Sequence, residues 1–217
     1  MDKDADLKNL EKRAYKSTFE DGLWDLFLGM IISGFGIAWI GDLMSLPGTL
    51  GTIIILLPWN VISILIFTLG KKYITIPRMG IVKFGKRRKR QRLVLIILLA
   101  LNVFFALVML ILFSFGTFED LDLSGVFFAL IIGLLIITVP LMILGIALQF
   151  YRLYIIAILG GMCFFFSELW YPLVGSPFDM LLSFGLIGGC FIVLGLIFLF
   201  RFIHKYPKPT EEVVDGN

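Results

Sequence analysis

Long uncharged apolar runs recur along this chain of 217 residues and restrict its fold more than any other feature. Stretches of 18 or more uncharged residues alternate with short polar segments, and each is long enough to cross the roughly 30 Å hydrocarbon core of a bilayer as a helix. Hydrophobic residues make up 59% of the chain and charged residues 16%, with a mean hydropathy of +0.98. A soluble domain would carry about 25% charged residues. The sequence therefore predicts an integral membrane protein.

The apolar runs predict an all-α transmembrane domain, residues 23–202, with six helices. We place them at about 23–41, 50–69, 93–115, 126–150, 153–171 and 180–202. Residues 1–22 would form a cytoplasmic N-terminal segment, with an amphipathic stretch at Leu7–Ala14 on the membrane surface. Residues 203–217 would form a cytoplasmic tail.

The boundary between the fourth and fifth helices is the least obvious, because 46 largely apolar residues run from Val126 to Tyr171. A single helix of that length would measure about 69 Å, more than twice the hydrocarbon thickness. We therefore expect the chain to reverse at Gln149–Arg152, where the only polar groups of this run can reach the headgroups.

The distribution of charge supports this topology. One side of the membrane would receive residues 1–22, the 71–92 connector, Arg152 and the C-terminal end, which hold 5, 10, 1 and 3 of the 19 basic residues. Positively charged short connectors stay cytoplasmic, so both termini are expected inside. The other side would receive six acids and no base: Asp42, Glu119, Asp120, Asp122, Glu168 and Asp179.

The connector at 71–92 is the longest predicted loop, and its first half alternates between apolar and polar residues. This alternation, interrupted at Pro77–Gly80, predicts a short cytoplasmic β-hairpin between the second and third helices. Two strands alone are marginal in water, so the hairpin would need support from the bilayer surface or from a partner.

Basic residues crowd the second half of the connector and give the leading functional hypothesis. The simplest interpretation is a topology anchor among anionic headgroups, where each Lys or Arg contributes about 1 kcal/mol. The sharper one is a docking site for an acidic lipid or an acidic cytoplasmic protein. Nucleic acid is the least supported partner, because no base-stacking platform accompanies the charge. The candidate binding residues are Lys83, Lys86, Arg87, Arg88, Lys89, Arg90 and Arg92.

Three short motifs resemble those of known sequences. They are YITIPRMGIVKF at Tyr73–Phe84, DGLWD at Asp21–Asp25 and RFIHKYP at Arg201–Pro207. These motifs, about 25 residues in all, are similar to an uncharacterised family of small multi-pass membrane proteins of bacteria and archaea. The resemblance implies a small prokaryotic membrane protein of unassigned activity and contributes no catalytic residue. We expect the protein in the cytoplasmic (inner) membrane.

Polar side chains within the predicted helices give the alternative function, a small transporter or channel. Asn60 and Asn102 fall at similar depth in neighbouring antiparallel helices, and Glu168 is the acid deepest in any predicted helix. Polar groups in hydrocarbon are costly and often mark a transport path. The simpler interpretation is hydrogen bonding between helices, worth about 0.6 kcal/mol per bond. A transporter of this size would act as a homo-oligomer, because six short helices enclose little space.

Small residues in the last two predicted helices indicate where these helices pack. Cys163 and Cys190 fall at comparable depth, each beside a glycine pair, Gly160–Gly161 and Gly188–Gly189. Together with the Gly185-x-x-x-Gly189 spacing, this predicts close packing of the two helices along that face.

The sequence lacks the motifs of the common membrane enzymes. Its single histidine, His204, lies near the C-terminus, and there is no H-E-x-x-H pair, Walker-type loop or carboxylate pair within the apolar runs. We therefore predict a non-catalytic protein without a cofactor or a bound metal.

Overall fold

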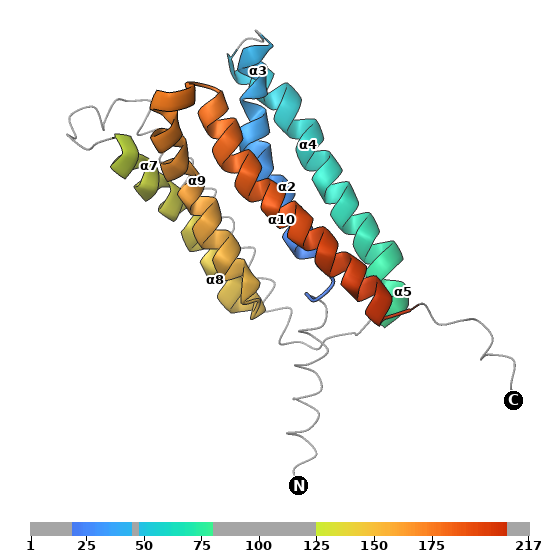
Figure 1. Ribbon diagram of the computed structural model, residues 1–217. Coiled ribbons are helices and arrows are strands. Elements are labelled where there is room, and N and C mark those ends of the chain that lie inside the picture. Colours follow the sequence, from blue (N-terminus) through green and yellow to red (C-terminus); the bar gives the residue numbers. More distant parts are fainter. Residues whose placement is uncertain (1–18, 45–47, 80–124, 208–217) are drawn as a thin grey trace, which may run out of the picture.

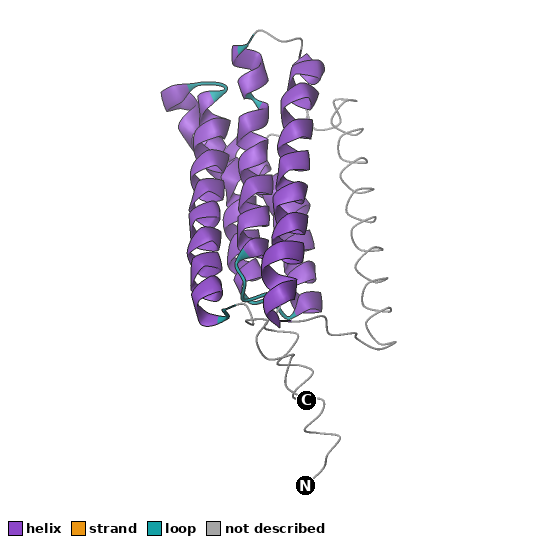
Figure 2. Ribbon diagram, turned by 90° about the vertical axis from the view of Figure 1, so that its right-hand side faces the viewer, coloured by secondary structure: helices purple, strands orange, loops and turns teal. Residues whose placement is uncertain are grey.

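The structure is a computed structural model that describes residues 19–44, 48–79 and 125–207. Every regular element in these ranges is a helix. The long helices lie side by side in a bundle, as the two perpendicular views show (Figures 1 and 2). The predicted helix at 93–115 and the predicted amphipathic stretch Leu7–Ala14 lie outside the described residues.

The elements of the three described ranges form five long helical segments. The first is α2 (Leu23–Ala38), followed by the short α3 (Ile40–Leu43). The second is α4 (Gly48–Gly70), which continues through the π-helical turn η1 (Lys71–Thr75) into α5 (Ile76–Met79). The third is α7 (Gly125–Gly133), η2 (Leu134–Thr138) and α8 (Val139–Leu148). The last two are α9 (Arg152–Val174) and α10 (Phe178–Lys205).

The prediction of six transmembrane helices is wrong. Four helices of the described residues are long and apolar enough to cross a membrane: Ile53–Arg78, Gly125–Leu148, Arg152–Val174 and Phe178–Lys205. The first predicted helix is too short, because α2 ends at Ala38, where the Trp39 N–H bonds to the Gly36 carbonyl in a tighter turn. Its 16 residues measure about 24 Å, less than the hydrocarbon thickness.

The predicted β-hairpin is also wrong, because the described residues contain no strand and Lys71–Met79 is helical. An alternation of apolar and polar residues over so short a stretch fits a helix as well as a strand. Lys71 and Thr75, four residues apart, reach the same carboxylate from one side of η1. Contacts with α2 therefore favour the helix, while the second half of the predicted hairpin lies outside the described residues.

The predicted chain reversal before Arg152 is confirmed. Gln149 adopts a left-handed conformation with φ of 53° and ends α8, and α9 begins three residues later. The two arms run antiparallel: the Thr138 Oγ1 donates a 3.0 Å hydrogen bond to the Ala157 carbonyl. Pro140 explains the adjacent π turn η2, because a proline removes one α-helical hydrogen bond and its ring displaces the preceding turn.

Glycines spaced seven residues apart form the interface between α2 and α10. A Cβ atom on Gly29 would lie 2.7 Å from the Ile192 nitrogen, and one on Gly188 would lie 2.6 Å from the Ser33 nitrogen. A Cβ on Gly195 would likewise clash with the backbone of α2. We call this contact the glycine seam: Gly22, Gly29 and Gly36 of α2 and its N-cap, with Gly188 and Gly195 of α10. Only residues without a side chain let the two backbones approach so closely.

The glycine face predicted to join the last two helices is a different one and is not an interface in the described residues. A Cβ on Gly185 or Gly189 would meet nothing within 4 Å. Gly160 faces Ile32 of α2, and Gly161 faces η2. The helices α9 and α10 do pack together, with the rings of Phe164 and Phe184 5.0 Å apart.

The two ends of the bundle differ in charge. We call the end where α2 begins and α10 finishes the basic end, and the end with α3 and the α9–α10 turn the opposite end (Figure 1). All lysines and arginines of the described residues lie at the basic end: Lys71, Lys72, Arg78, Arg152, Arg201 and Lys205. Exposed Tyr and Trp side chains, which prefer membrane–water interfaces, lie at both ends: Tyr73 and Tyr151 at one, and Trp39, Trp170 and Tyr171 at the other.

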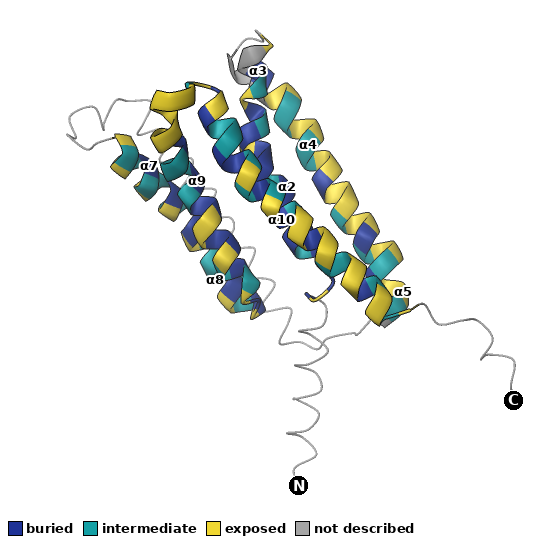
Figure 3. Cartoon of the chain, in the orientation of Figure 1, coloured by how far each residue is buried: buried dark blue, intermediate teal, exposed yellow. Residues whose placement is uncertain are grey.

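Between these ends the outer surface is apolar. Figure 3 shows α2 largely buried and α4 largely exposed, and the exposed side chains of α4 include Ile54, Leu57, Ile62 and Leu65. Such a continuous apolar surface, bordered by aromatic and charged residues, is typical of contact with lipid. Together with the four apolar helices, it indicates a membrane-embedded protein.

Candidate functional site

The turn before α2 and the first turn of α2 carry the two acids of the candidate site, Asp21 and Asp25. Residues 19–22 form a turn, and Gly22, the N-cap of α2, has φ of 73°, a conformation that glycine adopts without strain. A side chain at Gly22 would also overlap the Gly195 carbonyl of α10. The turn therefore lies directly against α10 and takes Asp21 into the bundle. The Leu23 N–H donates a 3.2 Å hydrogen bond to Asp21 Oδ1 and so begins α2.

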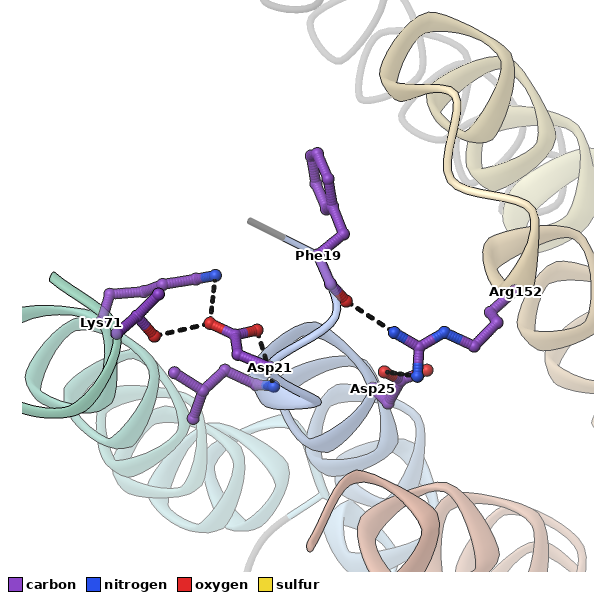
Figure 4. Close-up of polar contacts among 7 residues, drawn as sticks. Phe19, Asp21, Asp25, Lys71 and Arg152 are labelled. Carbon is purple, nitrogen blue, oxygen red and sulfur yellow. Dashed lines mark hydrogen bonds and ion pairs between the residues drawn. The ribbon is translucent and has the colours of Figure 1, made fainter. Parts of the chain in front are cut away.

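Asp21 is fully buried, with 0% of its surface exposed, and its carboxylate is satisfied by three donors. The Lys71 Nζ lies 2.6 Å from Asp21 Oδ2, and the Thr75 hydroxyl donates to the same oxygen, also at 2.6 Å (Figure 4). Both donors come from η1, directly after α4. A buried carboxylate persists only when it is paired and hydrogen-bonded. Asp21 therefore fixes the end of the α4 segment to the start of α2.

Arg152, at the start of α9, makes the second ion pair. Its Nη1 lies 3.0 Å from the buried Asp25 Oδ2, and its Nη2 donates to the Phe19 carbonyl (Figure 4). Among the described residues Asp25 Oδ2 has no hydrogen-bond partner of good geometry, so its contact with Arg152 is held by charge. The guanidinium also lies 4.3 Å from the centre of the Phe198 ring of α10, a favourable cation–π distance. Arg152 thus joins α2, α9 and α10.

The two ion pairs form one network at the basic end. Each buried carboxylate is neutralised by a single cation, so little net charge is left in the bundle. The described residues contain no group of three or more His, Cys, Asp or Glu side chains placed to hold a metal ion. The arrangement is suited to holding four helical segments in fixed relation, and it orients the start of the basic connector.

Sequence reasoning did not predict these pairs. It placed residues 1–22, the 71–92 connector and Arg152 on one side of the membrane by counting basic residues, and it left the partners of Asp21 and Asp25 open. The structure pairs Asp25 with Arg152, while the connector's Lys71 pairs with Asp21. The seven-residue glycine spacing shared by the two helices was the signal that could have indicated how α2 sits on α10.

The residues predicted for lipid binding and for transport do not belong to the described ion pairs. The basic cluster from Lys83 to Arg92 lies outside the described residues, as does Asn102. The Asn60 Nδ2 donates a 2.8 Å hydrogen bond to the Leu56 carbonyl of its own helix α4. Glu168 is exposed on α9. Because α4 packs against α2 and α3, the structure does not bring Asn60 and Glu168 together.

Comparisons with protein-family models, with curated proteins and with solved structures found no match to the chain. A function for this protein must therefore rest on its own residues.

Proposed function

We propose that the protein is a non-catalytic component of the cytoplasmic membrane whose basic segment, residues 71–92, binds anionic lipid headgroups at the inner face. The observation that supports this most is the attachment of Lys71 and Thr75 to Asp21, which holds the first turns of the segment at the basic end. The ten basic residues of the segment, over half of the chain's 19, would then begin from a fixed point at the membrane surface.

The first turns of the segment have the side chains expected at a headgroup layer. Lys72 and Tyr73 are exposed, and the Lys72 Nζ lies 5.3 Å from the centre of the Tyr73 ring. Ile76 is exposed beside them. Aromatic and apolar groups with a basic side chain among them fit the boundary between acyl chains and phosphates. Each additional Lys or Arg near an anionic surface adds about 1 kcal/mol of attraction.

Lipid selectivity of the full chain tests this proposal. The variant replaces Lys86, Arg87, Arg88, Lys89 and Arg90 by Gln, and both proteins are reconstituted into bilayers with a spin-labelled anionic or zwitterionic lipid. We expect the wild-type protein to concentrate the anionic lipid at low ionic strength and the variant to lose most of this preference. High salt should reduce the difference, because it screens exposed charges.

A charge-conserving variant is the matched control. Exchanging Lys for Arg and Arg for Lys at the same five positions keeps the electrostatic attraction and should keep the lipid preference. Wild-type preference in the Gln variant would contradict lipid binding. Loss of the preference in the exchange variant as well would contradict a purely electrostatic contact and point to recognition of the headgroup by the geometry of the Arg and Lys side chains.

The alternative of a transporter or channel gains no support from the described residues. Asn60 is engaged within its own helix, and Glu168 lies on a helix that α4 does not pack against. We therefore propose no transport path through these side chains.

A further inference from the structure

A second group of buried polar side chains lies at the opposite end of the bundle. Asp179, in the first turn of α10, has 5% of its surface exposed, and Ser167 of α9 has 1%. The Ser167 hydroxyl donates a 2.7 Å hydrogen bond to Asp179 Oδ2. Ser183, with 3% exposed, lies one helical turn after Asp179 and therefore on the same face of α10. From the sequence, Asp179 was named only as one of six acids on the side away from the basic residues, and its burial was not predicted.

In the part of the chain that the structure describes, two oxygens of this group have no hydrogen-bond partner. They are Asp179 Oδ1 and the Ser183 hydroxyl oxygen, both buried. Buried polar atoms without a partner are rare in native proteins and often mark the position of an ion or a water molecule. The two atoms lie one helical turn apart, and the Ser167 hydroxyl of α9 lies beside them. A positively charged ligand bound there would provide the partner that these oxygens lack.

Within the described residues, Asp179 also has no cationic partner, in contrast to the buried acids of the basic end. Asp21 has Lys71 and Asp25 has Arg152, whereas every lysine and arginine of the described residues lies at the basic end. The surroundings are apolar: Phe184, directly after Ser183, is fully buried and packs on Phe164. A carboxylate that stays ionised in such surroundings requires a counter-charge, and without one it takes up a proton.

We propose that Asp179, Ser167 and Ser183 bind a small monovalent cation, Na⁺. Carboxylate and hydroxyl oxygens are the ligands that hard cations prefer. The Ser167 hydroxyl gives its hydrogen to Asp179 and keeps its lone pairs for a cation. One carboxylate supplies one negative charge, so a monovalent ion leaves the site neutral, whereas a divalent ion would leave an uncompensated charge among apolar groups.

Thermal unfolding of the full chain in detergent tests this proposal. An ion that binds only the folded protein raises the Tm in proportion to the logarithm of its concentration above the Kd. We expect NaCl to raise the Tm relative to choline chloride at the same ionic strength, and ²²Na⁺ to bind saturably with one ion per chain. Asp179→Asn should abolish both effects, and the double variant Ser167→Ala, Ser183→Ala should weaken Na⁺ binding several-fold.

Glu168→Gln is the matched control, because Glu168 is an exposed carboxylate directly beside Ser167. It removes the same charge at the same end and should keep the Na⁺ response. An equal Tm in NaCl and choline chloride, or an unchanged response in Asp179→Asn, would overturn the proposal. If Asp179→Asn does not fold, ²²Na⁺ binding to the wild-type protein and its displacement by Li⁺ or K⁺ still decide: absence of saturable binding overturns the site.

Discussion

The contrast between two ion pairs at the basic end shows what burial does to a charge. Asp21 is fully buried and accepts from the Leu23 N–H, Lys71 and Thr75. Glu20, its neighbour, lies 4.0 Å from Lys205, and both side chains are more than half exposed. Water screens the second pair but not the first. Removing one partner of the buried pair leaves an unpaired charge away from water, which costs far more than the attraction itself.

We therefore expect Asp21→Asn to lower the free energy of unfolding by about 3 kcal/mol, because it breaks the ion pair between Lys71 and the buried Asp21. Reversible unfolding in mixed micelles measures this change. The control Lys205→Met, which breaks only the exposed pair, should change the free energy by about 0.5 kcal/mol or less. Adding Lys71→Met to Asp21→Asn should restore part of the loss, and simple additivity of the two changes would contradict a coupled pair.

At the scale of single residues, the sequence allowed the charges to be assigned to one end but not to each other. Which cation meets Asp21 depends on the rotation of α4 about its axis and on the position of η1, and neither follows from counting charge. The burial of Asp179 was not predicted, for a related reason. Asp179 lies just after a Gly-Ser-Pro turn, and its burial depends on the packing of α9 against α10.

Among the described elements, the helices α2 and α10 make the most extensive contact, and the glycines of the seam allow their backbones to approach so closely. A glycine inside a helix normally destabilises it relative to alanine by about 1 kcal/mol. That cost is offset where the absent Cβ lets two backbones meet. The same substitution should therefore have opposite effects on the two faces of α10.

Gly188→Ala should destabilise the protein by about 1–3 kcal/mol, because its Cβ would lie 2.6 Å from the Ser33 nitrogen of α2. Gly185→Ala, three residues earlier on the open face, should leave stability unchanged or raise it by up to about 1 kcal/mol. Thermal unfolding of both variants in the same detergent measures the difference. A loss of stability equal in the two variants would show that the seam does not depend on this close approach.

Element boundaries could be predicted where the thickness of the bilayer limits the length of a helix. They could not be predicted from the alternation of apolar and polar residues. The reversal before Arg152 followed from the impossibility of a single helix of about 69 Å in a bilayer. The prediction of a hairpin at Lys71 depended on a few alternating apolar and polar residues. The contacts of Lys71 and Thr75 with Asp21 stabilise a helix there instead. The end of the first helix at Ala38 carries no sequence signal as strong as a proline or a charge, so its shortness was not predicted.

For the whole molecule, the separation of charge predicts an orientation. Every lysine and arginine of the described residues lies at the basic end, and positively charged short segments are retained in the cytoplasm. We expect the basic end to face the cytoplasm. Cysteines introduced at Tyr206 and Gly175, in a background with Cys163 and Cys190 replaced by Ser, report on the two ends.

A membrane-impermeant thiol reagent added to intact cells should label the Gly175→Cys protein and not the Tyr206→Cys protein. Opening the cells should expose both. Labelling of position 206 in intact cells would reverse the orientation and would remove the inner-face lipids from the proposed function. Labelling of both positions would contradict a single orientation.

The composition and the long apolar runs allowed a membrane protein to be predicted, because runs of this length are typical of helices that cross a bilayer. The number of membrane-crossing helices was not predictable to the same degree, because a helix buried among others needs no particular length. The function was the hardest property to predict, because the role of the basic cluster and of the buried carboxylates depends on their binding partners, which the sequence does not reveal.

The shortness of α2 has a further consequence. Most of its side chains are buried, and it packs between α4 and α10, so protein replaces lipid around it. A helix of about 24 Å in such a position is not exposed to hydrophobic mismatch, whereas α10, with 28 residues and a length of about 42 Å, must tilt or extend beyond the acyl chains. The outer helices would thus adjust to differences in bilayer thickness by changing their tilt. The spacing between Asp21, just before α2, and Asp25, in its first turn, would stay constant.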